Sequence, residues 1–212
     1  MITNQVVSRI PTNRKIIALT FDIANGNKVP VRMLSLLKRK GVKSATFFVT
    51  GIWVRSYPRI ARLIVQHGYE IASHGNRHQD YRKHSNIWIA KEVKVARKSI
   101  NQATGIMTNM IRTPGGEMNA RVIQKLQSMN QTIVHWDVDS LDWKLTDVKE
   151  IVDRVVPHAR KGSNVLLHAS DPWTQSLKAV PLIIKGLSQK GYRFVTVSDL
   201  LRGTKNYNKK AH

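Results

Sequence analysis

Short apolar runs alternate with amphipathic segments along most of the chain, which predicts alternating strands and helices. The runs expected to form strands are apolar, β-branched or aromatic, a pattern typical of parallel strands buried on both faces. They lie at 16–21, 44–51, 69–74, 110–114, 131–138, 164–169 and 192–197. Segments with the helical period lie at 29–40, 57–67, 86–104, 119–129, 147–161 and 174–190.

Glycines mark the ends of five of the expected helices, at Gly41, Gly68, Gly105, Gly162 and Gly191. Glycine tolerates the left-handed conformation that commonly closes a helix. Strands that alternate with helices imply right-handed crossovers and a parallel sheet. This pattern leaves two architectures open, an open doubly wound sheet and a barrel with fewer than the usual eight units. The first strand is not followed by G-x-G-x-x-G, which weighs against a dinucleotide site.

Composition narrows the possible chemistry. The 212 residues are 42% hydrophobic and include no cysteine, which excludes disulfides, thiolate metal sites and cysteine nucleophiles. No apolar run reaches the roughly 18 residues of a membrane span. Residues 1–12 lack a basic start followed by an apolar core, so we expect no signal peptide in this chain.

The net charge of +22 first suggests a nucleic-acid partner. The basic residues are spread along helices and loops, however, and no recognition-helix, zinc-finger or ribonucleoprotein motif is present. We therefore expect no nucleic-acid partner. A diffuse positive surface also fits an anionic polymer or an acidic membrane surface, and part of it is expected to be ordinary solvated helix faces.

Acidic, histidine and arginine side chains gather at the C-terminal ends of the expected strands. Asp22 ends the first strand, His74 the third and His168 the sixth, while Arg112 lies in the fourth and Asp142 follows the fifth. Active sites of βα barrels form at this rim. Taken singly, each residue has a structural explanation, such as a helix cap for Asp22 or a core position for His168. Their shared placement favours an active site.

His78 follows His74 by four residues, so that one helical turn would bring both imidazoles to one side, as a metal pair requires. Alone, this spacing is a weak signal and more often reflects surface polarity.

These residues, in this order, resemble the five motifs of the polysaccharide deacetylases of carbohydrate esterase family four, the NodB homology domain. The matching segments are 20–22, 74–78, 112–115, 139–143 and 166–168. The resemblance implies a distorted, incomplete (β/α)7 barrel that is TIM-barrel-like. It also implies three parts, namely an N-terminal extension (1–14), the deacetylase domain (15–202) and a basic C-terminal tail (203–212), which we expect to be loose.

The resemblance implies a hydrolase that acts on a carbon–nitrogen bond other than a peptide bond. It would remove N-acetyl groups from amino-sugar glycans such as peptidoglycan or chitin-like chains. Asp22 would be the general base, and Arg112 would hold it in its ionised form. His168 would be the general acid, oriented by Asp142.

Binding roles are implied in the same way. Pro114, Trp143 and Leu166 would contribute to the substrate pocket, with Trp143 and Leu166 around the acetyl methyl group. His74 and His78 would hold a divalent metal, zinc in the first place. We expect a monomer at the cell wall or elsewhere outside the cytoplasm, where an anionic cell-wall polymer or a membrane surface is a further partner.

One position departs from the family pattern. The first motif normally carries two aspartates, of which the second completes a metal triad with the two histidines, and Ile23 stands there instead. Sporulation-associated bacterial members resemble this chain in having Ile there. Three outcomes are open. The metal binds weakly, or another oxygen ligand substitutes, or the site is empty and the protein is weak or inert. Candidates for the substitute ligand are Asn25, Asn76 and Asp80.

A second function is compatible with the same residues. A non-catalytic protein that binds cell-wall glycan would keep the groove and stack sugar rings on Trp143 and Trp173.

Overall fold

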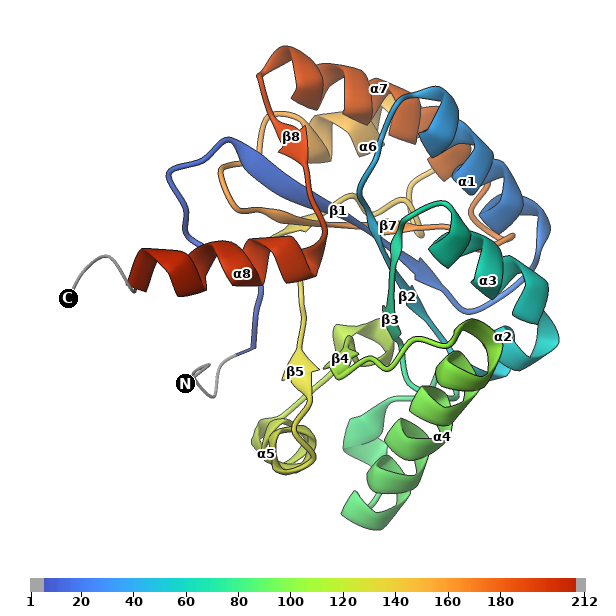
Figure 1. Ribbon diagram of the computed structural model, residues 1–212. Helices are drawn as coiled ribbons and strands as arrows, with labels where there is room; N and C mark the ends of the chain where they lie inside the picture. The colour runs from blue at the N-terminus through green and yellow to red at the C-terminus, as the bar shows by residue number, and fades with distance from the viewer. Residues whose placement is uncertain (1–5, 209–212) are drawn as a thin grey trace.

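The computed structural model describes residues 6–208, which form a parallel sheet curled into part of a barrel (Figure 1). The strands are β1 (Ile16–Ile23), β2 (Thr46–Val49), β3 (Glu70–Ser73), β4 (Met110–Ile111), β5 (Thr132–Ile133), β6 (Val138–Asp139), β7 (Asn164–His168) and β8 (Arg193–Phe194). Their order is β5-β4-β3-β2-β1-β7-β6, and β8 pairs with the start of β1. No pairing joins β5 to β6 within the described residues, so the barrel is incomplete, and the predicted fold is confirmed.

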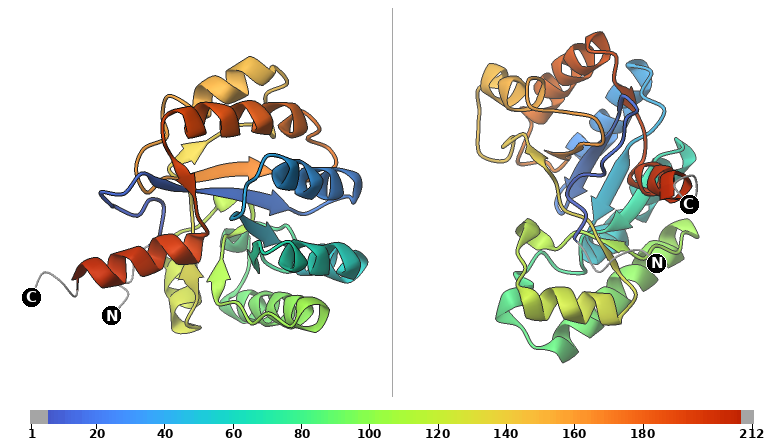
Figure 2. Two further views of the ribbon diagram at one scale, coloured as in Figure 1. Left: turned by 45° about the horizontal axis from the view of Figure 1, so that its top comes forward. Right: turned by 90° about the vertical axis from the view of Figure 1, so that its left-hand side faces the viewer.

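Helices cover the outside of the sheet (Figures 1 and 2). They are α1 (Lys28–Arg39), α2 (Gly51–Ser56), α3 (Pro58–Gln66), α4 (Asn86–Thr104), α5 (Ala120–Ser128), α6 (Val148–Val155), α7 (Ser176–Gln189) and α8 (Val197–Asn208), with short 3₁₀ turns at Tyr81–Lys83 and Pro114–Gly116. Figure 2 shows β1 and β7 side by side, with α6 and α7 on one side of the pair and α1 beside α7.

Strand alternation divides β1 between two environments. Leu19, Phe21 and Ile23 belong to the large hydrophobic cluster that also includes residues of the surrounding helices. Ala18 belongs to a smaller second cluster with Phe48 of β2. Thr20 and Asp22 follow Ala18 at every second position and so face the same side of the strand. The barrel side of β1 therefore becomes polar toward its C-terminal end.

Strand register carries the candidate residues to one rim. Asp22 pairs with Phe48 of β2 on one side and with His168 of β7 on the other. The backbone N–H of Arg112 donates to Ser73 at the end of β3, directly before His74. The C-terminal ends of β1, β3, β4 and β7 therefore meet, as the strand-end pattern predicted.

Asp171, in the loop after β7, fixes the start of α1. Its carboxylate accepts hydrogen bonds from the backbone N–H groups of Asn27, Lys28 and Val29. These groups have no partner inside the helix, and a carboxylate also suits the positive end of the helix dipole. Gly26 makes room, since a Cβ there would lie 2.0 Å from Cγ of Asp171.

Several expectations about local structure are corrected. The expected strand 131–138 is two short strands, β5 and β6, which pair with different neighbours. The expected strand 44–51 ends at Val49, and α2 was not predicted; Thr50 starts this helix because its side chain accepts from the N–H of Trp53.

The two ends of the chain also differ from expectation. The expected loose tail, 203–212, overlaps α8, which continues to Asn208, while residues 209–212 lie outside the described range. Near the other end, Val7 and Arg9 form isolated bridges to Val134 and Ser163, and Ile10 is buried. The expected extension therefore packs on the barrel at residues 6–10.

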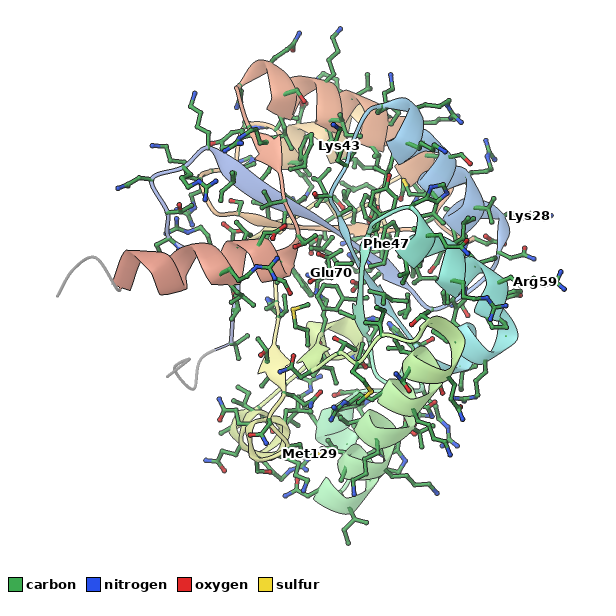
Figure 3. All side chains as sticks on the ribbon, viewed as in Figure 1. Lys28, Lys43, Phe47, Arg59, Glu70 and Met129 are labelled. Atoms are coloured by element: carbon green, nitrogen blue, oxygen red, sulfur yellow. The ribbon has the colours of Figure 1, made fainter. Side chains whose placement is uncertain are left out.

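Phe47 at the centre of the large cluster provides a test of this packing. Its ring is fully buried and stacks on Phe21 at 5.1 Å (Figure 3). Replacing Phe47 by Ala should lower the free energy of unfolding by about 3–5 kcal/mol, because it leaves a cavity. Denaturant unfolding measures this change. Val31→Ala on the exposed face of α1 is the control, with an expected change within about 0.5 kcal/mol. Equal losses in both variants would contradict the assignment of the core.

Candidate active site

A cavity of about 340 Å³ opens at the rim where the strand ends meet. Its lining combines acidic, imidazole and indole side chains. The lining residues are Asp22, His74, His78, Gly115, Glu117, Trp136, Asp139, Trp143, Leu166, His168 and Trp173. A pocket of this size, largely apolar with converging polar groups, is the usual form of a small-molecule or sugar site.

A buried ion pair forms the floor of this site. Arg112 Nη1 donates to Asp22 Oδ1 at 2.6 Å, and Arg112 Nη2 donates to Thr20 Oγ1 at 2.9 Å and to the carbonyl of His135 at 3.2 Å. Both charged side chains are almost completely buried. Burial raises the pKa of Asp22, but the charge of Arg112, with smaller contributions from His168 and from the Arg112 hydrogen bond, outweighs it and holds the pKa below the usual range. Asp22 is therefore a carboxylate at neutral pH.

His168 has its own carboxylate partner. Asp142 accepts from the backbone N–H of His168 at 2.9 Å, and its Oδ1 lies 2.7 Å from His168 Nδ1. Ser176 Oγ also donates to Asp142 at 2.6 Å, so the carboxylate is held in one orientation. Burial lowers the pKa of His168, but the hydrogen bond and charge of Asp142 outweigh it and raise the pKa above its ordinary value. His168 thus retains its proton to a higher pH than a free histidine does.

His74 is placed like a metal-binding histidine. Its Nδ1 lies 3.0 Å from the carbonyl oxygen of Arg112, which requires the proton on Nδ1 and leaves a lone pair on Nε2. Nε2 lies 3.6 Å from Asp22 Oδ2, and the His78 ring centre is 5.1 Å from that of His74. Burial lowers the pKa of His74 to about 4, so the imidazole is neutral and free to bind a cation.

The loop that carries these histidines is held from two sides. Glu92 of α4 is buried, and its carboxylate accepts from Asn76 Nδ2 at 3.0 Å and from the N–H of Arg77 at 2.8 Å. The first N–H group of α2, that of Gly51, donates to the carbonyl of Gly75 at 2.9 Å. The pair His74 and His78 is therefore positioned by the fold.

The residues present do not complete a metal site. No group of three or more His, Cys, Asp or Glu side chains able to hold a metal occurs within residues 6–208. Ile23 is fully buried in the large hydrophobic cluster and does not line the cavity. Two imidazoles remain, beside an aspartate that is already paired with Arg112.

The three candidate substitute ligands do not line the cavity. Asn76 is bound to Glu92 and Arg55, and Asp80 to Arg82. Asn25 is exposed. The substitution of another oxygen ligand, which the sequence left open, thus has no support in the arrangement of these side chains.

The binding residues expected from the sequence are partly brought together. Trp143, Leu166 and Trp173 line the cavity, and Trp143 remains 46% exposed. Pro114 is buried and does not line it, because the chain turns there and presents Gly115 instead.

Trp136, Asp139 and Glu117 also line the cavity and had no role in the sequence-based site. The sequence pattern predicts Trp136 inside a continuous strand, 131–138, but in the structure it lies in the break between β5 and β6. A Cβ at Gly116 would lie 2.3 Å from the Trp136 ring, so this glycine allows the indole to close one wall. A tryptophan beside Asp137 near an expected strand end was the signal available in the sequence.

The fold and the site define the class of protein. A TIM-barrel-like sheet presents the ionised Asp22 and the carboxylate-bound His168 at a small cavity, an arrangement suited to acid–base hydrolysis. The polysaccharide deacetylase family matches residues 9–134, more than half of the chain. The chain belongs to the polysaccharide deacetylase family.

Relatives and solved structures agree with this assignment. The uncharacterized protein YlxY of Bacillus subtilis is 30% identical over 91% of this chain, which covers 59% of that protein. A peptidoglycan-N-acetylglucosamine deacetylase of Bacillus cereus is 32% identical, and the match covers 94% of both chains. The crystal structure of a CE4-family pseudoenzyme from Bacillus anthracis aligns with a TM-score of 0.87 and 27% identity, covering 94% of this chain and 70% of that one.

The link between Asp142 and His168 can be tested by titration. Asp142→Asn removes the charge that raises the histidine pKa, so burial alone should leave the His168 pKa below 6.5. The stabilisation linked to that proton, present below pH 6.5 and lost as pH rises through the folded-state pKa, should disappear. NMR titration of the imidazole ring measures the pKa. Asp147→Asn, at the exposed cap of α6, is the control. An unchanged His168 pKa in Asp142→Asn would refute the assignment.

Proposed function

We propose that this protein hydrolyses N-acetyl groups on amino-sugar glycans, with low activity because its metal site lacks one ligand. The arrangement of Asp22 with Arg112 and of His168 with Asp142 around one cavity carries the proposal. Relatives named as peptidoglycan deacetylases support peptidoglycan as the glycan class. A structural neighbour described as a CE4 pseudoenzyme supports the low activity.

The acid–base groups fit the two proton transfers of this reaction. Asp22, kept ionised by Arg112, takes a proton from water as the water oxygen attacks the acetyl carbon. His168, kept protonated by Asp142, gives a proton to the nitrogen as the carbon–nitrogen bond breaks, which yields acetate and a free amine. Leu166 and Trp143 supply apolar surface for the acetyl methyl, and the N–H of Gly115 is the backbone donor proposed for the oxyanion.

Deacetylases of this family are generally metal-dependent. His74 and His78 are the groups proposed to contact a divalent cation here, with zinc as the first candidate. Loss of a neighbouring group that merely orients a ligand already costs roughly 10–100-fold in affinity or activity, and loss of an anionic ligand should cost at least as much. The replacement of that ligand by Ile23 is the reason for the low activity.

Partners and location follow from the glycan. We propose an N-acetylated glycan substrate met outside the cytoplasm, at the cell wall, and a monomeric protein. The structure has no helix within residues 6–208 that is long and apolar enough to cross a membrane. We propose 15–202 as the deacetylase domain, with residues 6–10 of the N-terminal extension packed against it and a basic segment after 202.

Acetate release from N-acetylated glycan oligomers tests the proposed reaction. Wild-type protein should release acetate slowly, and added zinc should raise the rate. The rate should fall as pH rises above the raised pKa of His168, because the proposed acid then loses its proton. Oligomer binding with no acetate released, even in excess zinc, would instead establish a non-catalytic glycan-binding protein.

Restoring the missing carboxylate tests the cause of the low activity. Ile23→Asp should tighten zinc binding at least about tenfold and raise acetate release, and His168→Ala in that background should lower the rate by roughly 10²–10⁴-fold. Calorimetric zinc titration and acetate assays measure both. Ala24→Asp, which adds the same charge one position later, is the control. If Ile23→Asp alters neither quantity, Ile23 does not occupy the metal-ligand position.

A further inference from the structure

Charge is distributed unevenly around the barrel, because acidic residues are scarce in one part of the chain. Residues 28–104, which contain α1 to α4, include sixteen Lys and Arg but three Asp and Glu. Glu92 is the one acidic residue on these four helices, and it is 3% exposed and bound to the histidine loop. The outward surface of α1 to α4 therefore presents cations without carboxylates. In contrast, α6 and its cap alternate acidic Asp147, Glu150 and Asp153 with Lys149 and Arg154.

The cations form stripes along three helices. Lys91, Lys94 and Lys98 are exposed on α4 at i, i+3 and i+7, which places them on one helix face. The second stripe is Arg59 and Arg62, which are exposed on α3. Arg62 also donates to the carbonyl of Ala103, near the end of α4, at 3.4 Å.

The third stripe lies on α1. Lys28, Arg32 and Arg39 are exposed there, with Lys38 and Lys40 beside Arg39. In Figure 3, Lys28 and Arg59 project outward at the same side of the molecule. Figure 1 shows α1, α3 and α4 following one another around the outside of the sheet. We call the outward surface formed by these three stripes the basic face. Its stripe residues make no ion pair with any described residue.

We propose that the basic face binds a linear polyol-phosphate polymer, in which phosphodiesters join small polyols that carry no nucleobases. Guanidinium and ammonium groups are the side chains that recognise phosphate, and repeated contacts gain affinity by releasing counterions. The face curves around the barrel, so a flexible chain can follow successive stripes whereas a flat bilayer meets one at a time. No large apolar side chain is exposed from Arg59 to Arg62 or from Lys91 to Lys98, and on α1 such a residue is Val31, which is 38% exposed. This is little apolar surface for insertion into a membrane.

This surface is separate from the cavity, whose lining among the described residues includes no Lys or Arg but three carboxylates, Asp22, Glu117 and Asp139. A polyanion is thus favoured on the basic face and disfavoured in the cavity. The polymer would hold the protein beside the glycan without competing for the site, and this binding does not depend on catalysis.

Two matched charge variants of the full chain test the proposal. The face variant is Arg59→Gln, Lys91→Gln, Lys94→Gln, Lys98→Gln. The control is Lys161→Gln, Lys178→Gln, Lys185→Gln, Arg193→Gln, which removes the same charge from exposed positions elsewhere. None of these eight side chains has a side-chain hydrogen bond recorded in the structure. Circular dichroism melting checks that both variants fold.

Binding to poly(glycerol phosphate) is measured over a range of salt concentrations. The face variant should bind at least about tenfold more weakly, with the slope of log affinity against log salt reduced by roughly 3 to 4. The control should change affinity less than about twofold. Equal losses in both variants, or no loss in the face variant, would show diffuse attraction and overturn the proposal.

Two further probes test the choice of partner, namely a 20-base-pair DNA duplex and phosphatidylglycerol vesicles. If the duplex and the vesicles both bind more weakly than the polymer at equal phosphate concentration, the choice of the polymer as partner is supported. Tighter face-dependent binding of the duplex or of the vesicles would replace the polymer by nucleic acid or membrane.

Discussion

The buried ion pair between Asp22 and Arg112 is the interaction on which the site depends. It joins the ends of β1 and β4 across the barrel interior, where neither charge could persist alone. Arg112 remains charged there because Asp22, Thr20 and the carbonyl of His135 accept its hydrogen bonds. Removing either charged partner would leave an uncompensated ion in the interior, at a cost of about 3–5 kcal/mol. The same pair keeps Asp22 ionised, as the proposed role of a base requires, so the fold and the proposed function depend on one contact.

The other polar residues of the site form two sets, one on each side of this ion pair. On one side, Asp142 orients His168 and raises its pKa, so that the imidazole keeps its proton, and Ser176 holds Asp142 in place. His168 therefore has the support that the proposed role as general acid needs. On the other side, Glu92 and α2 hold the loop of His74 and His78 in place, yet the third metal ligand is missing. We propose that the protein keeps the scaffold of a metal site, including a neutral His74 with a free Nε2, without the anionic group that would complete it.

The sequence predicted those features that depend on strand ends and residue type. Asp22, His74, Arg112 and His168 meet because parallel strands bring their C-terminal ends to one rim, and the acid–base partners follow from the motifs. It did not predict Trp136, because the short break between β5 and β6 cannot be distinguished from a continuous apolar strand. It also missed α2 and most of α8, which depend on a cap at Thr50 and on packing against β1. The basic face was hidden because stripes on α1, α3 and α4 become neighbours only after folding.

We propose an intact acid–base set beside an incomplete metal site, and metal analysis of the purified wild-type protein tests this proposal most directly. After one equivalent of zinc is added and unbound metal is removed by gel filtration, the account predicts clearly less than one zinc per chain. One tightly held zinc per chain would contradict it, since a third ligand would then be present that the arrangement of Asp22, Ile23, His74 and His78 does not provide.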